Sequence, residues 1–257
     1  MTVIAADSLV PTMCVEDKSQ SSPIILHAPH GSRFIPDWHR PSFVVSPAEL
    51  DRELDRMTDA HTDDIVRSIN GPSSIVAGLS RVVVDVERFP DEREEMLTVG
   101  MGAFYTHGSQ RQHLRTIRDE HRAALTTYFD AYAAAFTDLV QATLDAHGRA
   151  FIIDVHSFPV DALPYELHSS ARRPQLDLGT DPVHTCQALL EGAKRAFKRL
   201  DIDLNSPFAG TYVPLRFYGT TPQVQSLMLE LRRDVVAISR GRLVEELDAL
   251  CSALLSL

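Results

Sequence analysis

Short apolar runs alternate with helical periodicity along almost the whole chain, and this alternation limits the possible folds more than any other feature. The runs are rich in Val, Ile and Leu and are bounded by Gly, Pro or polar residues, as buried strands are. They end at Leu26, Ala77, Val86, Val155 and Leu231. Between them, helical patterns occupy residues 47–69, 110–147, 182–200 and 234–256. Strands that alternate with helices predict one α/β domain, a mixed and mostly parallel sheet flanked by helices.

Two of the predicted helices carry clear end signals. The long Ala-rich helix is expected to stop at Gly148, because glycine readily adopts the left-handed conformation that ends helices. The helix over 182–200 is expected to begin with Asp181 as its N-cap and Pro182 in its first turn.

Two segments lack regular periodicity. Residues 1–22 predict an irregular N-terminal arm that precedes a domain of residues 23–257. Residues 200–223 are rich in Gly, Pro and aromatic side chains and predict a loop plus a hairpin.

Charge and composition exclude several classes of partner. A net charge of −10 argues against nucleic acid, whose phosphates require a basic surface, but a few local arginines can still attract a small anionic substrate. No apolar run approaches the ~20 residues of a membrane span, and no signal-peptide pattern is present. Neither a disulfide framework nor a cysteine zinc site is expected, because the three cysteines lie far apart: Cys14, Cys186 and Cys251. A cytoplasmic protein is expected, and its oligomeric state is left open.

Two predicted strands end in histidines. "IILHAPHGSRFIP" places His30 just after an apolar run, and "FIIDVHSFP" places Asp154 and His156 on one face of another. A single histidine at a strand end is more often a hydrogen-bonded structural group than a ligand. Two such strands favour a shared site, because α/β proteins build sites at the carboxyl ends of their strands.

A hydrolytic zinc site built on two histidines requires a carboxylate as well. The segment "ELDRELDRMTDAHTDDIV" offers several candidates, most of which also fit a solvated acidic helix face. Asp55 and Asp59 lie one helical turn apart and would repel each other without a nearby cation. Spacing alone leaves the choice open among Glu53, Asp55, Asp59, His61, Asp63 and Asp64.

Further polar residues are typical of hydrolytic chemistry. Glu230 interrupts the apolar run "VQSLMLELRRD", where a charged carboxylate is costly to bury without a partner. It is a candidate general base. Arg81 and Arg88 bracket "RVVVDVE" and are candidates for binding a carboxylate or an oxyanion. For Arg81 taken alone, a surface salt bridge is the simpler interpretation.

Seven short motifs occur in the order found in the N-formylglutamate amidohydrolase family, from about residue 24 to 235: "APHGS", "MTDAH", "LSRVVVDVERFP", "IIDVHSFP", "LDLGT", "SPFAGTYVPLRFYG" and "VQSLMLELRRD". The chain resembles that family, whose typical motifs are P-H-[SA]-G, T-D, D-x-N-R, D-x-H-S, D/N-x-G-T and L-E-L. The resemblance implies the fold of zinc carboxypeptidases and aspartoacylase, a phosphorylase/hydrolase-like architecture. It also implies a metal at the carboxyl edge of the sheet.

The resemblance implies a role for each matching residue. A divalent metal, with zinc favoured, would be bound by His30, Asp59 and His156. Glu230 would be the catalytic glutamate, and Arg81 would lie near the scissile carbonyl. The residues expected to contact a small anionic substrate are Arg88, which would bind its carboxylate, with Ser32, Thr211, Tyr212 and Arg216.

One departure from the family pattern affects the expected substrate. The family's D-x-N-R reads "DVER" here, so Glu87 replaces an asparagine and is expected to oppose a dianionic substrate or neutralise Arg88. N-formyl-L-glutamate is the leading substrate, and another N-acyl amino acid or small amide is the alternative. An inactive binding protein of the same fold is the competing class. A serine hydrolase is disfavoured because no G-x-S-x-G occurs.

Overall fold

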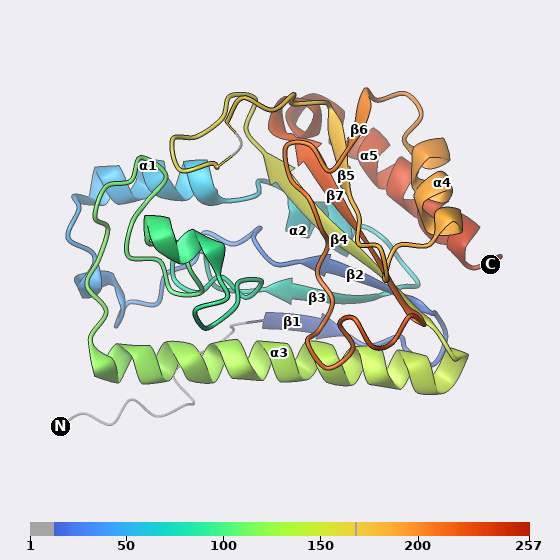
Figure 1. Ribbon diagram of the computed structural model, residues 1–257, viewed down its shortest axis with the longest axis horizontal. Coiled ribbons are helices and arrows are strands. Elements are labelled where there is room, and N and C mark those ends of the chain that lie inside the picture. The colour runs from blue at the N-terminus through green and yellow to red at the C-terminus, as the bar shows by residue number, and fades with distance from the viewer. Residues whose placement is uncertain (1–12, 168) are drawn as a thin grey trace.

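The computed structural model describes residues 13–167 and 169–257, which form one α/β domain around a seven-stranded mixed sheet (Figure 1). The strand order is β1-β3-β2-β4-β7-β5-β6. Strands β3, β2, β4 and β7 are parallel, β1 and β5 pair antiparallel with β3 and β7, and β6 is parallel to β5. The bounds are β1 Met13–Glu16, β2 Ile24–Ala28, β3 Ser73–Ala77, β4 Ala150–Phe158, β5 Leu176–Gly179, β6 Ile202–Leu204 and β7 Val224–Arg232. The predicted fold class is confirmed.

Helices cover both faces of the sheet, and for this reason the central strands are apolar on both sides. Every residue of β2, β3 and β4 is buried. On one face, α1 and the long α3 enclose a core that includes Ile25, Ile75 and Ile152. On the other face, α2, α4 and α5 pack against neighbouring strand residues. The bounds are α1 Pro47–Met57, α2 Thr62–Arg67, α3 Asp119–His147, α4 Gln187–Ala196 and α5 Arg233–Leu254, with short 3-10 helices at Arg40–Ser42 and Glu95–Val99.

The predicted helices differ from the observed ones mainly at their starts. The pattern over 47–69 is two helices, α1 and α2, because Thr58 is extended and His61 has a φ of 66°. Helix α3 ends at Gly148 as predicted, with a φ of 68° at that glycine. Asp181 instead caps a turn, where it accepts hydrogen bonds from the backbone N–H of Val183 and His184. Helix α4 starts later, after Cys186.

Other segments correct the predicted strands. Residues 81–86 were predicted as a strand but form turns, in which Val83 and Val84 donate to the carbonyl of Ser80. Their valines are buried in the core beneath α3, so the apolar run reflects burial rather than sheet pairing. Residues 200–223 contain no hairpin, only β6 alongside β5. Part of the predicted arm forms β1, whereas residues 1–12 lie outside the described residues.

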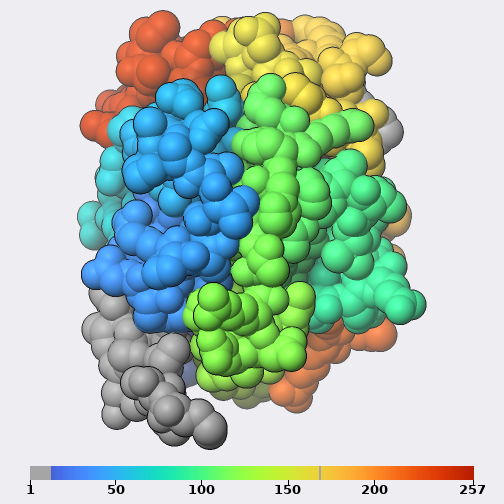
Figure 2. Space-filling model, turned by 90° about the vertical axis from the view of Figure 1, so that its left-hand side faces the viewer, coloured from blue at the N-terminus to red at the C-terminus, as the bar shows by residue number. Residues whose placement is uncertain are grey.

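A buried arginine holds the turn segment in place. Arg115 is fully buried and donates to the carbonyls of Val83 (2.7 Å) and Tyr105, and to Nε2 of His39. Within the described chain no carboxylate is paired with Arg115, and burial lowers its pKa to about 9. On the same side of the molecule, residues near 110 pack alongside α1, as Figure 2 shows. Ser109 and Gln112 bind the buried carboxylate of Glu53 there.

We expect His39 to make the fold acid-labile. Burial and the positive charge of Arg115 lower its pKa to about 3, whereas a histidine in the unfolded chain titrates near its ordinary value of 6.5. Unfolding therefore takes up a proton as the pH falls from about 6.5 towards 3, which removes up to about 1.4 kcal/mol of stability per pH unit. Urea unfolding between pH 7 and 5 should show a shallower loss of stability in His39→Gln than in the parent protein. His113→Gln, at an exposed position, is the control. Parallel pH profiles for His39→Gln and parent would contradict the assignment.

Among the described residues, no helix is both long and apolar enough to cross a membrane.

Candidate metal centre

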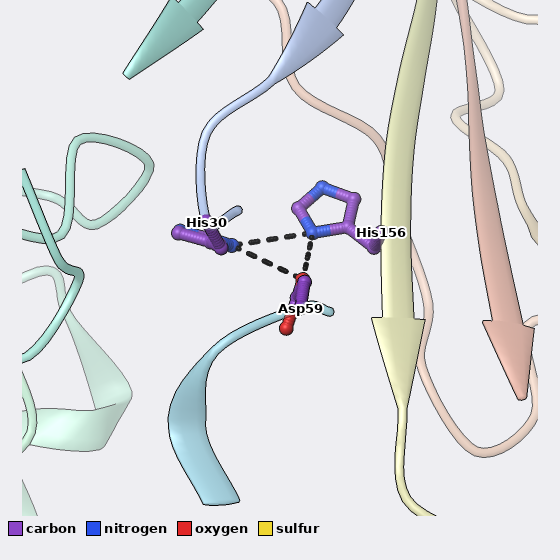
Figure 3. Close-up of side chains that lie close together, drawn as sticks. All are labelled: His30, Asp59 and His156. Carbon is purple, nitrogen blue, oxygen red and sulfur yellow. Dashed lines mark hydrogen bonds and ion pairs between the residues drawn. The ribbon is translucent and has the colours of Figure 1, made fainter. Parts of the chain in front are cut away.

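Three side chains from separate elements converge at the carboxyl edge of the sheet (Figure 3). His30 lies in the loop after β2, Asp59 lies between α1 and α2, and His156 lies on β4. His156 Nδ1 is 3.2 Å from His30 Nδ1 and 3.0 Å from Asp59 Oδ2, and His30 Nδ1 is 3.6 Å from Asp59 Oδ2. All three residues are buried. The structure therefore brings together the three residues proposed as ligands from the sequence.

The outer nitrogen of each imidazole is bound by another carboxylate. His30 Nε2 lies 2.8 Å from Asp85 Oδ1, and His156 Nε2 lies 2.9 Å from Asp154 Oδ1. An Nε2–H that donates to such a carboxylate leaves Nδ1 as an acceptor. Two Nδ1 lone pairs and one carboxylate oxygen then face one another, an arrangement that repels unless a cation lies among them. Two imidazoles and one carboxylate also match the donor set of a hydrolytic zinc site, so these residues fit a divalent metal.

The surrounding charges support this conclusion. Burial alone would raise the pKa of Asp59, but when Nδ1 of His156 and His30 carries a proton in place of a metal, hydrogen bonds from these nitrogens hold the pKa of Asp59 far below its ordinary value, so Asp59 is anionic. Burial alone would lower the pKa of His156, yet the charges of Asp154 and Glu87 raise it well above the usual range. Protons and a metal would therefore compete for the same nitrogen atoms.

The loop geometry explains how Asp59 reaches the histidines. The helical pattern breaks after Met57, and the backbone N–H of Asp59 donates to the carbonyl of His30 over 3.0 Å. Gly31 allows this approach, because a Cβ there would lie 2.9 Å from Cβ of Asp63. Continuing α1 through residue 59 would remove this hydrogen bond.

The other acidic candidates of this segment have different partners. Glu53 binds Ser109 and Gln112, and the exposed Asp55 pairs with Arg33. His61 and Asp64 pair with each other and with Arg240 at the surface. Of the candidates in this segment, Asp59 is the one that groups with His30 and His156 among the described residues.

Glu230 lies beside the group of His30, Asp59 and His156, called the metal cluster below because of its donor atoms. The sheet register pairs it with His156, and its side chain is on the wall of the adjoining cavity. It is 9% exposed, and its Oε2 has no hydrogen-bond partner among the described residues. Burial raises its pKa to about 8, an effect that His156 opposes and Asp59 reinforces. A buried, unpartnered carboxylate with a raised pKa is suited to proton transfer.

The two arginines proposed from the sequence both reach the site. Arg81 Nη2 lies 2.9 Å from Asp85 Oδ2, and its Nη1 lies 3.6 Å from Asp59 Oδ1. Arg88 lines the cavity and pairs with Glu94 at 3.3 Å and with Asp85 at 3.5 Å. Arg81 thus contacts Asp59 of the cluster, and Arg88 on the cavity wall is already paired with Glu94.

Glu87 does not pair with Arg88, the interaction expected from the sequence. Its carboxylate lies 3.3 Å from His156 Nε2, 3.3 Å from His27 Nδ1 and 3.7 Å from His30 Nε2. The extra negative charge is therefore directed towards His27 and the two histidines of the cluster, and Glu94 is the carboxylate that offsets the charge of Arg88.

The proposed substrate-binding residues have mixed positions. Thr211, Tyr212 and Arg216 line the cavity. Tyr212 stacks on Phe136 with ring centroids 5.4 Å apart. Ser32 is not on the cavity wall, and its hydroxyl donates to the carbonyl of Gly78 over 2.6 Å.

Arg233 is a site residue that the sequence analysis missed. Its Nη2 lies 3.5 Å from Asp59 Oδ1, and its Nη1 donates to the carbonyl of Arg56 over 2.7 Å. It follows Glu230 by three residues in "ELRRD", where β7 passes into α5. That position at a strand end is a signal that could have identified it.

The cavity beside the metal cluster has a volume of about 1190 Å³. Ligand pockets usually measure roughly 300–1,000 Å³, so this one is large. Aromatic side chains form much of its wall, including Phe89, Phe129, Phe158, Tyr165 and Phe208.

Comparisons with known proteins agree with this architecture. Residues 22–237 match the model of the family described as N-formylglutamate amidohydrolase. Among solved structures, the N-formylglutamate amidohydrolase of Ralstonia eutropha superposes with a TM-score of 0.79 at 19% identity, covering 96% of this chain and 98% of that one. A gene product of Agrobacterium tumefaciens superposes with a TM-score of 0.72 at 18% identity, with 97% of each chain covered. No curated protein gave a significant sequence match.

Proposed function

Because the chain belongs to the N-formylglutamate amidohydrolase family, we propose that it is a metal-dependent hydrolase of N-formyl amino acids, with N-formyl-L-glutamate as the leading substrate. The observation that carries the proposal is the convergence of three acceptors, His30 Nδ1, His156 Nδ1 and Asp59 Oδ2, next to an unpartnered Glu230. The products would be glutamate and formate.

The reaction adds water across the amide, so one C–O bond forms and one C–N bond breaks. His30, Asp59 and His156 would hold a divalent metal, most favourably zinc, which would supply Lewis-acid polarisation and lower the pKa of water. Glu230 takes the proton of the attacking water on Oε2 and returns it to the leaving amine nitrogen. Arg81 stabilises negative charge on the former carbonyl oxygen.

The carboxylates behind the histidines orient them. Asp85 accepts from His30 Nε2, from the hydroxyl of Tyr105 (2.7 Å) and from Arg81. Asp154 accepts in the same way from His156 Nε2. These contacts fix which nitrogen of each ring faces the metal, a common function of carboxylates around metal sites.

The direct test is formate release from N-formyl-L-glutamate. We expect turnover by the zinc-loaded protein, loss of turnover after chelation and recovery when zinc is restored. Absence of formate release from a panel of N-formyl amino acids, with the metal bound, would contradict the proposal.

A second candidate substrate follows from the cavity. About 1190 Å³ lined by aromatic rings exceeds what a formyl group and a glutamate side chain need. An N-acyl amino acid with a larger apolar group would bury more of this wall. Comparing kcat/KM for N-formyl, N-acetyl and N-benzoyl glutamate distinguishes a formyl substrate from one with a larger acyl group. The larger acyl group should be preferred only if it occupies the cavity.

We expect Arg88→Ala to raise KM for N-formyl-L-glutamate by an amount equivalent to ~2 kcal/mol or more, the cost of losing a charge-assisted pair. Arg88→Lys should recover only part of the loss, because lysine cannot bind a carboxylate bidentately. Substrates with amidated carboxyl groups should lose little in Arg88→Ala. Arg172→Ala removes an exposed arginine paired with Asp201 and serves as the control. Equal losses for acid and amide substrates would show that Arg88 is only structural.

A further inference from the structure

A second convergence of ligand atoms lies behind the metal cluster. His27, Glu87 and Asp154 each offer one atom, and these atoms lie within 4.8 Å of one another. His27 Nδ1 is 2.9 Å from Asp154 Oδ1 and 3.3 Å from Glu87 Oε1. The sheet register brings His27 of β2 opposite Asp154 of β4. None of the roles proposed above uses His27.

Two features of this group match those of a metal site. Glu87 Oε1 is buried without a hydrogen-bond partner among the described residues, although it lies next to a second carboxylate. The outer nitrogen of His27, Nε2, lies 2.9 Å from the hydroxyl of Tyr132 on α3. When Nε2–H donates to that hydroxyl, Nδ1 is left as an acceptor, as in the two histidines of the first cluster.

A cation has a route to this group. Glu87 and Asp154 both lie on the wall of the large cavity, whereas His27 is fully buried behind them. Two carboxylates and one imidazole are a suitable donor set for zinc and similar divalent ions. Glu87 supplies the second negative charge of this group, beside that of Asp154. An asparagine at position 87, as in the motif D-x-N-R, would offer only a neutral oxygen.

We propose that His27, Glu87 and Asp154 form a second divalent-cation site, separate from the site of His30, Asp59 and His156. The two sites are linked through Asp154, whose Oδ1 also lies 2.9 Å from His156 Nε2. A cation on Asp154 draws electron density from that carboxylate and weakens its hydrogen bond to His156. Occupancy of the second site therefore changes the affinity of the first.

The test is zinc stoichiometry of the full chain, measured by titrating zinc into metal-free protein and by elemental analysis after gel filtration. The parent should bind two equivalents. Glu87→Gln should retain one, and so should Asp59→Asn, which removes a ligand of the other site. Glu92→Gln, an exposed acid on the same segment, should bind two. Cobalt in place of zinc should give visible absorption that differs between Glu87→Gln and Asp59→Asn, because the remaining ligands differ.

One equivalent in the parent, or two equivalents in a folded Glu87→Gln, would overturn the second site. His27→Asn provides an independent variant should Glu87→Gln not fold, and it should also retain one equivalent. The second site does not depend on the proposed activity, and the outcomes separate the two. If the parent binds one metal and releases formate, and Asp59→Asn binds none, the proposed function stands and the second site does not.

Discussion

His30→Ala should lose the metal equivalent of the first site and reduce formate release by more than ~100-fold. Carboxylates that merely orient metal-bound histidines are typically worth 10–100-fold, so removing a ligand itself should cost more. The fold should persist, because His30 lies in a loop and the remaining cluster loses a repulsive contact when the metal is absent. Elemental analysis and circular dichroism measure the two outcomes.

The matched control for this variant is His113→Ala, an exposed histidine outside the described site. It should retain both the metal and the activity. Full metal content in His30→Ala, or equal loss in His113→Ala, would show that His30 is not a ligand.

Glu230→Gln should reduce turnover by ~10²-fold or more, the usual contribution of positioned acid–base catalysis, and leave KM nearly unchanged. Glutamine keeps the size of the side chain but has no basic oxygen. Metal content should also be retained, because Glu230 is not among the three proposed ligands. Steady-state kinetics on metal-loaded protein give the measurement.

Glu246 offers a close control for this second variant. It is a buried glutamate on α5 whose two carboxylate oxygens both lack hydrogen-bond partners among the described residues, and it is not on the cavity wall. Glu246→Gln should keep parental turnover. Near-parental turnover in a folded, metal-loaded Glu230→Gln would show that Glu230 is not the general base.

The strand ends could be predicted from sequence because their signal is local. An apolar run followed by His30, or by Asp154 and His156, indicates a buried strand that reaches a sheet edge. Parallel strands bring such ends together, and β2, β4 and β7 do so here. The alternation of residues along β4 also predicted that Asp154 and His156 share one face, and in the structure Asp154 Oδ1 and His156 Nε2 lie 2.9 Å apart.

Asp59 could not be singled out as a candidate ligand from the local sequence pattern alone. The acidic residues of segment 53–64 are alike in charge, and the predicted continuous helix gave no reason to choose one of them. At the break in the helix, Gly31 packs against Asp63 and the backbone N–H of Asp59 donates to the carbonyl of His30, contacts that are distant in sequence. Only the resemblance to a known family singled out Asp59.

The segment around Asp85 shows why apolar patterns mislead. Its valines are buried like strand residues, yet their backbone makes turns and pairs with no strand of the sheet. The contacts of Glu87 and Arg233 were also missed, since each depends on groups far apart in the sequence. Tertiary contacts of this kind leave no periodic signal.

The anchoring of the turn segment by Arg115 has a consequence for how such a site can diversify. Residues 84–90 contribute several charged groups to the cavity, yet this segment is fastened from behind by one guanidinium bound to the carbonyls of Val83 and Tyr105. Hydrogen bonds to main-chain oxygens do not depend on which side chains those residues carry. Substrate preference can therefore change at the positions of this segment other than Asp85 and Glu87, which contact the histidines, by selection or by grafting loops between relatives, while the sheet, His30 and His156 keep their positions.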